Sequence, residues 1–130
     1  MSLTSRNLLP DAVKYFHKIM DVHEKVNSVN LVEKDRYKAI CEIFLKDERR
    51  LVTYVGDVHV LTAADVREIV TEYEEVNCIV VVSNWDHYTL EAKKVAKELE
   101  ISVFTLKEFM RAINYNGRKF LDTGVAKATE

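Results

Sequence analysis

The segment Asn84-Trp85-Asp86-His87-Tyr88 gathers the side chains of this sequence that are best suited to contact a ligand or a nucleic acid. It follows the apolar run 78–82, and open α/β sheets bind ligands beyond the ends of such strands. Aromatic rings can stack on bases, and free N–H groups at a helix start favour anions. The alternative is that Trp85 and Tyr88 pack over the sheet end or in a dimer contact. We favour this alternative, because sheet ends and interfaces commonly use such aromatic side chains.

Two short basic stretches are further candidates for contact with nucleic acid. They comprise Lys46, Arg49 and Arg50 at a predicted hairpin tip, and Arg111, Arg118 and Lys119 near the C-terminus. Acidic residues are interspersed in both stretches. A solvated surface is therefore the interpretation that we favour for each of them.

The histidines and cysteines form no recognisable metal or redox motif. His17 and His23 are six residues apart on a predicted helix, so they do not share a face well, and no third ligand lies near His59. Cys41 and Cys78 lack the CxxC spacing and lie in apolar runs, which predicts buried, reduced thiols. We expect no cofactor to be held by these residues.

Composition predicts one folded domain in a reducing compartment. The chain has 130 residues, 48% of them hydrophobic, which is enough for a core without a disulfide or metal. The formal net charge is −2, from 19 basic and 21 acidic residues, so no overall positive charge drives binding to nucleic acid. The expected thiols, and the absence of a secretory signal or a membrane-spanning apolar run, predict a cytoplasmic protein without a membrane partner.

Hydrophobic periodicity in the N-terminal half predicts one helix followed by two or three strands. The helix begins near Pro10 and ends near Lys25, because the polar residues in 27–30 favour local side-chain bonds over further helix. Residues 37–46 alternate between apolar and polar, and residues 50–55 form the return strand of a hairpin.

The C-terminal half predicts alternating helices and strands. Thr62 and Thr89 each have the position of a helix N-cap. The β-branched run 78–82 predicts a strand that is buried on both faces of a parallel sheet. A short strand at 101–104 and a last helix over about 106–114 follow, with Asn116-Gly117 ending that helix.

The predicted order of elements defines the fold class as α/β. A hairpin followed by parallel β-α-β units gives a mixed central sheet with helices on both faces. We expect a single domain over residues 1–122. The small and polar residues 123–130 are predicted to form a flexible C-terminal tail.

Residues 79–109 carry a strand–helix–strand pattern with small residues at fixed positions. A buried strand ends in a small polar residue, a Thr-x-x-Ala-x-x-x-Ala helix follows, and a short strand then begins with isoleucine. The residues concerned are Ile79, Val80, Val81, Val82 and Ser83, then Thr89, Ala92 and Ala96, then Ile101 and Leu106. This segment resembles the C-terminal half of Mrr-like members of the restriction-endonuclease-like, or PD-(D/E)xK, superfamily. The resemblance implies a restriction-endonuclease-like fold.

The resemblance also implies a metal site for which this chain lacks several residues. In the family, a carboxylate on the second strand and a Glu/Gln-x-Lys on the third strand hold a divalent metal and activate water. Alignment by the hairpin places the carboxylate at Cys41 or Glu42 and the second motif at Thr53-Tyr54-Val55. Glu42 is the best catalytic candidate. Thr53 and Val55 replace the acid or amide and the lysine.

Three hypotheses follow from these observations. The first is a catalytically inactive restriction-endonuclease-like module, without a cofactor, that acts in nucleic-acid binding or protein assembly. The second is a Mg²⁺-dependent DNA nuclease with migrated residues, in which Asp57 or Glu33 joins Glu42 at the metal and Lys38 or Lys46 supplies the lysine. The third is an unrelated small α/β interaction domain that forms a homodimer. We favour the first, because the Glu-x-Lys motif is absent.

Overall fold

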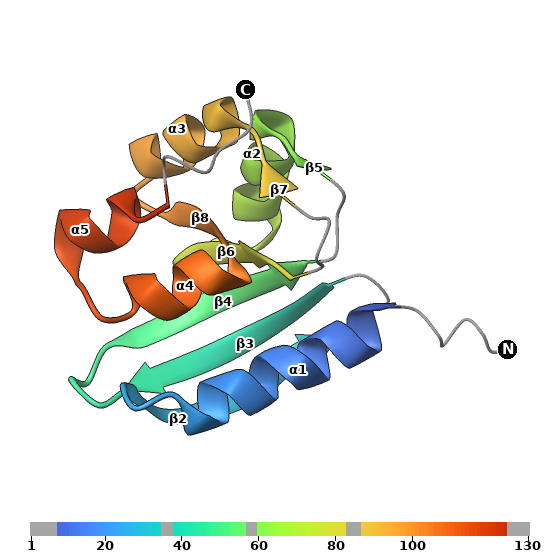
Figure 1. Ribbon diagram of the computed structural model, residues 1–130. Coiled ribbons are helices and arrows are strands. Elements are labelled where there is room, and N and C mark those ends of the chain that lie inside the picture. Colours follow the sequence, from blue (N-terminus) through green and yellow to red (C-terminus); the bar gives the residue numbers. More distant parts are fainter. Residues whose placement is uncertain (1–7, 35–37, 57–59, 83–86, 125–130) are drawn as a thin grey trace, which may run out of the picture.

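The computed structural model describes residues 8–34, 38–56, 60–82 and 87–124, with the backbone alone for residues 8–13 and Lys34. Its main sheet has five strands in the spatial order β2-β3-β4-β6-β8 (Figure 1). These strands are β2 (Val26–Lys34), β3 (Lys38–Leu45), β4 (Arg50–Gly56), β6 (Cys78–Val81) and β8 (Ser102–Thr105). The helices are α1 (Leu8–Val22), α2 (Ala63–Glu72), α3 (Leu90–Glu98), α4 (Leu106–Ala112) and α5 (Gly117–Asp122). A second, small parallel sheet pairs β5 (Val60–Leu61) with β7 (His87–Tyr88).

The main sheet is mixed, as the sequence predicts. Strands β2, β3 and β4 pair antiparallel, and β4, β6 and β8 pair parallel. The predicted hairpin is the β3–β4 pair, and the turn between its strands places Glu48 at φ 75°. All four residues of β6 are buried, which confirms the prediction for the β-branched run. Helices α1, α4 and α5 cover one face of the sheet and α2 and α3 the other (Figure 1).

The first face of the sheet is closed by an aromatic core. Phe16 and Met20 of α1 are fully buried, in agreement with the predicted apolar stripe of this helix. The ring of Phe109 on α4 stacks on Phe16 at 5.9 Å and lies 5.7 Å from Phe104 of β8. Burial of each such side chain contributes roughly 2–3 kcal/mol, so this face is a main source of stability.

The second face depends on two well-capped helices. Thr62 accepts a hydrogen bond from the N–H of Asp65, and the Asp65 carboxylate accepts one from the Thr62 N–H, so the predicted N-cap at Thr62 is confirmed and forms a capping box. Thr89 accepts from the N–H of Ala92 in the same way. Ala92 and Ala96 are fully buried, which allows α3 to approach its neighbours closely.

Strand β2 is the additional strand that the prediction of two or three strands left without a location, and it lies between α1 and β3 in the chain. The helix itself ends at Val22, earlier than the predicted Lys25. Residues 27–30 form strand because Val26 and Val29 pair with β3 and are buried. This burial outweighs the preference of the asparagines for turns. Two register shifts, at Val26/Ser28 and Leu31/Glu33, interrupt the pairing of this edge strand.

The C-terminal segment differs from its prediction. The helix predicted over about 106–114 ends at Ala112, and Asn116-Gly117 starts α5 rather than ending a helix. Phe120 of α5 is buried and packs edge-on against Phe104 at 5.1 Å. Burial of this one ring explains why a segment with a turn-like start becomes helical.

Candidate functional site

Of the positions that the resemblance assigns to metal chemistry, Cys41, Thr53 and Val55 lie on the closed face of the sheet. Cys41 of β3 pairs opposite Thr53 of β4, and both are fully buried together with Val55. The Thr53 hydroxyl lies 3.4 Å from the Cys78 Sγ and 3.4 Å from the Leu51 carbonyl oxygen. Burial raises the pKa of Cys41 to about 11 and of Cys78 to about 12, so both thiols are protonated at neutral pH, in agreement with the predicted core thiols.

Glu42 lies on the opposite face of the same strand, in a part of that face that borders a cavity. Its Oε2 accepts a hydrogen bond of 2.6 Å from the Nε of Arg50, and the Arg50 Nη2 contacts the same oxygen. Arg50 also lies 3.7 Å from an oxygen of Glu75. Arg50, a candidate contact for nucleic acid, is therefore engaged with two carboxylates.

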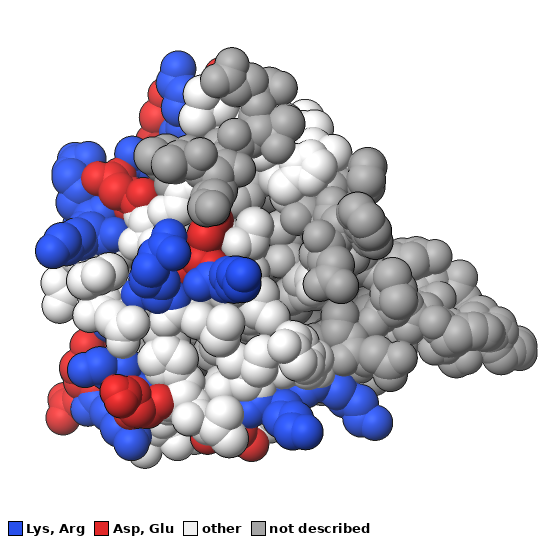
Figure 2. Space-filling view, in the orientation of Figure 1, with Lys and Arg blue, Asp and Glu red and all other residues white. Residues whose placement is uncertain are grey.

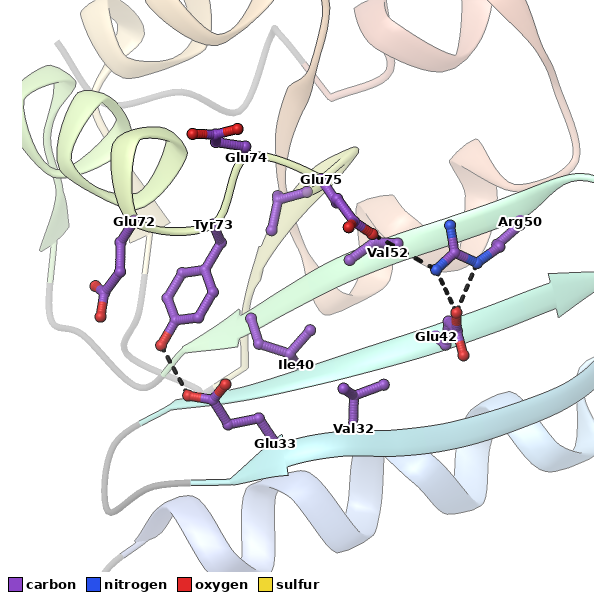
Figure 3. Close-up of a pocket in the computed structure, with 11 residues that line it drawn as sticks. Val32, Glu33, Ile40, Glu42, Arg50, Val52, Glu72, Tyr73, Glu74 and Glu75 are labelled. Carbon is purple, nitrogen blue, oxygen red and sulfur yellow. Dashed lines mark hydrogen bonds and ion pairs between the residues drawn. The ribbon is translucent and has the colours of Figure 1, made fainter.

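A cavity of about 440 Å³ adjoins Glu42, between β2, β3 and β4 and the chain that leaves α2 (Figure 3). We call it the acidic groove. Its apolar lining consists of Val32, Ile40, Val52, Val76 and the ring of Tyr73. Its charged lining consists of Glu33, Glu42, Glu72, Glu74, Glu75 and Arg50, a formal charge of −4. The groove is thus a hydrophobic depression in an acidic surround.

A second set of polar contacts lies at the end of the groove away from the Glu42–Arg50 pair. The Tyr73 hydroxyl donates a hydrogen bond of 3.0 Å to Glu33. The Lys38 ammonium lies 3.5 Å from a Glu72 oxygen and 5.0 Å from the centre of the Tyr73 ring. Tyr73, followed by Glu72, raises the pKa of Lys38 above its ordinary value, so this ammonium keeps its charge.

Lys38 and Glu42 therefore make separate pairs. They are four residues apart on one strand, roughly 13 Å at the usual strand rise. A nuclease with migrated residues needs a lysine and two acids within a few ångströms of one another. In the part of the chain that the structure describes, no group of three or more His, Cys, Asp or Glu side chains is arranged to hold a metal ion. Of the two predicted additional ligands, Glu33 pairs with the Tyr73 hydroxyl and Asp57 lies outside the described residues.

A second polar cluster is buried in the core between α3, β8 and the chain after α5. We call it the Lys93 cluster. The fully buried Lys93 ammonium donates to the Ser102 hydroxyl at 2.8 Å, the Val103 carbonyl at 2.8 Å and the Thr123 carbonyl at 2.7 Å. Burial lowers the pKa of Lys93 to about 8, although Glu108 opposes this shift. With three acceptors, the ammonium has used all of its donors.

Tyr88 and Glu108 complete the Lys93 cluster. The Tyr88 hydroxyl lies 2.7 Å from Glu108 Oε1 and 2.8 Å from the Gly124 carbonyl oxygen, two alternative acceptors for its one proton. Glu108 Oε1 also accepts from the Thr105 N–H in a capping box, and Oε2 is buried with no hydrogen-bond partner in the part of the chain that the structure describes. Gly124 has φ 87°, and a Cβ there would overlap the Glu108 carboxyl group. The chain at residues 123–124, part of the predicted tail, is therefore anchored.

The predicted ligand loop is only partly described. Asn84, Trp85 and Asp86 lie outside the described residues, and His87 is half-buried in β7. Tyr88 is fully buried, so its ring takes part in the core rather than in stacking on a ligand. This placement is the packing interpretation of that residue.

The predicted basic stretches also make contacts within the protein. Arg49 donates from Nη1 to the Tyr115 carbonyl at 2.6 Å and from Nη2 to the Ile113 carbonyl at 2.9 Å, while its Nε pairs with Asp47. Arg49 thus ties the hairpin tip to the end of α4. The basic residues near the C-terminus, Arg111, Arg118 and Lys119, are exposed. Figure 2 shows basic groups around α4 on this side of the molecule, with acidic groups among them.

Sequence reasoning named Glu33, Glu42 and Arg50 of the acidic groove and Tyr88 of the Lys93 cluster for other roles, and it missed the remaining residues of both sites. The run Glu72-Tyr73-Glu74-Glu75 after a predicted helix was a visible signal, because it sets three carboxylates and a ring at one helix end. Lys93 gave a weaker signal. It follows Leu90 by three residues and so lies on the apolar stripe of its helix, where a lysine is unusual.

Comparison with known proteins gives no relative from which to assign this site. No protein-family model matches the chain, and no curated protein or solved structure does either. Among the helices that the structure describes, none is long and apolar enough to cross a membrane. The function must therefore be argued from the site itself.

Proposed function

We propose that this chain is a catalytically inactive module of restriction-endonuclease-like fold that acts in protein assembly. The observation that carries the proposal is the burial of Cys41, Thr53 and Val55 at motif positions, while Glu42, the alternative carboxylate position, is paired with Arg50. None of the three offers a carboxylate or an ammonium, and their full burial keeps water and phosphate away. A mixed α/β sheet with these buried positions supports a scaffold that lacks the groups the chemistry needs.

Topology supports the scaffold part of the proposal. The resemblance requires the two motifs on the second and third strands of the chain, next to each other. Strands β3 and β4 are the second and third strands of the main sheet and pair directly, with Cys41 opposite Thr53. The helix that the family has before the buried strand is α2, and β6 is that strand.

Charge supports protein over nucleic acid as the partner. The open face of the sheet holds the acidic groove, which repels phosphates. Both arginines of the predicted hairpin-tip stretch are bound within the protein, Arg49 by backbone carbonyls and Arg50 by carboxylates. A protein surface is the partner class that this distribution suits.

The test is a cleavage assay on supercoiled, linear and single-stranded DNA with Mg²⁺ and with Mn²⁺. The folded chain and its Glu42→Ala variant are run in parallel, and duplex DNA binding is measured by fluorescence anisotropy at low ionic strength. We expect no DNA cleavage. We also expect the chain to bind duplex DNA no more tightly than an acidic control protein of similar size does. Cleavage that disappears in Glu42→Ala would overturn the proposal and identify a migrated active site.

A further inference from the structure

The acidic groove combines two features that together define the chemistry of a partner. Its floor is apolar, because Ile40, Val52 and Val76 are each about 95% buried by the protein and turn their remaining surface to the cavity. Its surround carries five glutamates against one arginine. A side chain with an apolar stem and a cationic head matches both features, since lysine and arginine lay their methylenes on apolar surface and keep the charge at the rim.

The protein's own cations show how such a head is held. Lys38 lies against the Tyr73 ring and the Glu72 carboxylate at one end of the groove. Arg50 lies between Glu42 and Glu75 at the other end. Figure 3 shows Glu72 and Tyr73 directed from the end of α2 toward the strands, and Glu75 directed toward Arg50. Ammonium and guanidinium groups are therefore both accommodated by these walls.

Several carboxylates of the groove remain able to bind a further cation after these internal pairs are made. Glu74 has no hydrogen bond or ion pair in the described part of the chain, and the side chain of Glu75 is 80% exposed at 3.7 Å from its arginine. Among the described residues, Glu33 accepts only from the neutral Tyr73 hydroxyl. Negative charge in the groove thus exceeds the positive charge that the protein supplies.

The edge strand restricts how a partner can approach. The register shift at Leu31/Glu33 leaves Val32 outside the regular pairing with β3, and this side chain is 60% exposed beside the groove. A bulge of this kind in an edge strand disrupts the ladder that an added strand would need. A partner is therefore recognised through side chains that enter the groove and not through extension of the sheet.

We infer that the acidic groove is a docking site for a cationic, partly apolar segment of another protein, with an arginine or lysine side chain inserted over Ile40 and Val52. This inference rests on the proposed function, because it names the class of partner for the same module. Charge complementarity and the apolar floor specify the occupant: alternating basic and aliphatic residues.

The test uses fluorescein-labelled short peptides and fluorescence anisotropy. The probe alternates arginine with leucine. One comparison peptide replaces leucine by serine, and another replaces arginine by glutamate. We expect binding of the arginine–leucine peptide, weaker binding of the arginine–serine peptide and none of the glutamate peptide. Binding should weaken as ionic strength rises to about 0.15 M, where interactions between exposed charges more than about 8 Å apart are largely screened.

The site is located with matched double variants. Glu74→Gln with Glu75→Gln removes two charges at the groove and should weaken the arginine–leucine peptide about tenfold. Glu91→Gln with Glu98→Gln removes the same charge from exposed positions of α3 and should leave the affinity within twofold. Equal weakening in both double variants, or no binding by the folded wild-type chain, overturns the inference. The cleavage result is independent, so failure of the groove and failure of the inactive-module proposal are distinguishable.

Discussion

The Lys93 cluster and the acidic groove are built from the same kinds of side chain but differ in what surrounds them. In the Lys93 cluster, one ammonium satisfies three acceptors, and the chain after α5 closes over it. In the acidic groove, five glutamates face one arginine around a cavity. The comparison teaches that a buried, saturated cation holds the fold together, whereas carboxylates in excess around an open cavity are available to a partner.

Removal of the buried ammonium should have the largest effect on stability. Lys93→Ala takes the aliphatic stem out of the core and leaves the Ser102, Val103 and Thr123 oxygens without the donor they share. We expect the free energy of unfolding in urea to fall by about 3 kcal/mol. The exposed neighbour Lys94→Ala is the control and should change it by less than about 0.5 kcal/mol. Equal effects at the two lysines would show that the cluster does not stabilise the fold.

The same ammonium should give stability a distinctive dependence on pH. The unfolded chain keeps the Lys93 proton to about pH 10.5, whereas burial lets the folded chain release it near pH 8. The unfolded state therefore binds more protons in this window, and stability from this group rises with pH. Relative to Lys93→Met, the wild type should gain about 2 kcal/mol between pH 7 and pH 9.5. The comparison with Lys93→Met removes most of the opposite contribution of the cysteines, whose raised pKa values lower stability as pH rises. A difference that stays constant or shrinks with pH would contradict the buried, partly neutral lysine.

The closure of the chain over Glu108 should be sensitive to a single methyl group. Gly124→Ala introduces a Cβ that overlaps the Glu108 carboxyl group, on a backbone with φ 87°. We expect a loss of about 2 kcal/mol in thermal or urea unfolding, because the carboxylate is held by Tyr88 and Thr105 and cannot move away freely. Gly117→Ala has φ 61° but open space around its Cβ, so it measures the backbone strain alone and should cost about 1 kcal/mol. Equal losses would mean that the packing against Glu108 contributes nothing.

The groove should show the smallest effect on stability, which sharpens the contrast with the Lys93 cluster. Glu42→Gln keeps the shape of the side chain but removes one charge from a pair whose arginine side chain is 47% exposed. We expect a change below about 1 kcal/mol in the free energy of unfolding, because solvent screens such pairs. A loss as large as that of Lys93→Ala would show that Glu42 serves the fold and would weaken the case for an open site.

Much of the fold was accessible from the sequence because local signals and tertiary packing agree there. The β3–β4 hairpin, the buried strand β6 and the caps at Thr62 and Thr89 follow from alternation, β-branching and side-chain oxygens at helix starts. Strand β2 and helix α5 were harder. Asparagines in β2 and a glycine at the start of α5 favour other local structures, and only burial of Val29 and Phe120 overrides them.

The candidate site was less predictable, because it joins residues that are far apart in the chain. The sequence singled out Glu42 and Arg50 but for different roles, a metal ligand and a nucleic-acid contact. Their direct pairing depends on the antiparallel register of β3 and β4, and their link to Glu75 depends on where the chain leaves α2. The acceptors of Lys93 include a carbonyl at position 123, thirty residues away, which no local pattern encodes.

The contact of Arg49 with the end of α4 sets an order of events during synthesis. Antiparallel pairing of β3 and β4 can begin as soon as both strands leave the ribosome. The guanidinium, however, finds its carbonyl partners only when positions 113 and 115 exist, after more than sixty further residues. At typical elongation rates of about 5–20 residues per second, this takes several seconds. Throughout that interval the closed face of the nascent sheet lacks Phe109 and Phe120. Its hydrophobic surface is then exposed to solvent and accessible to chaperones.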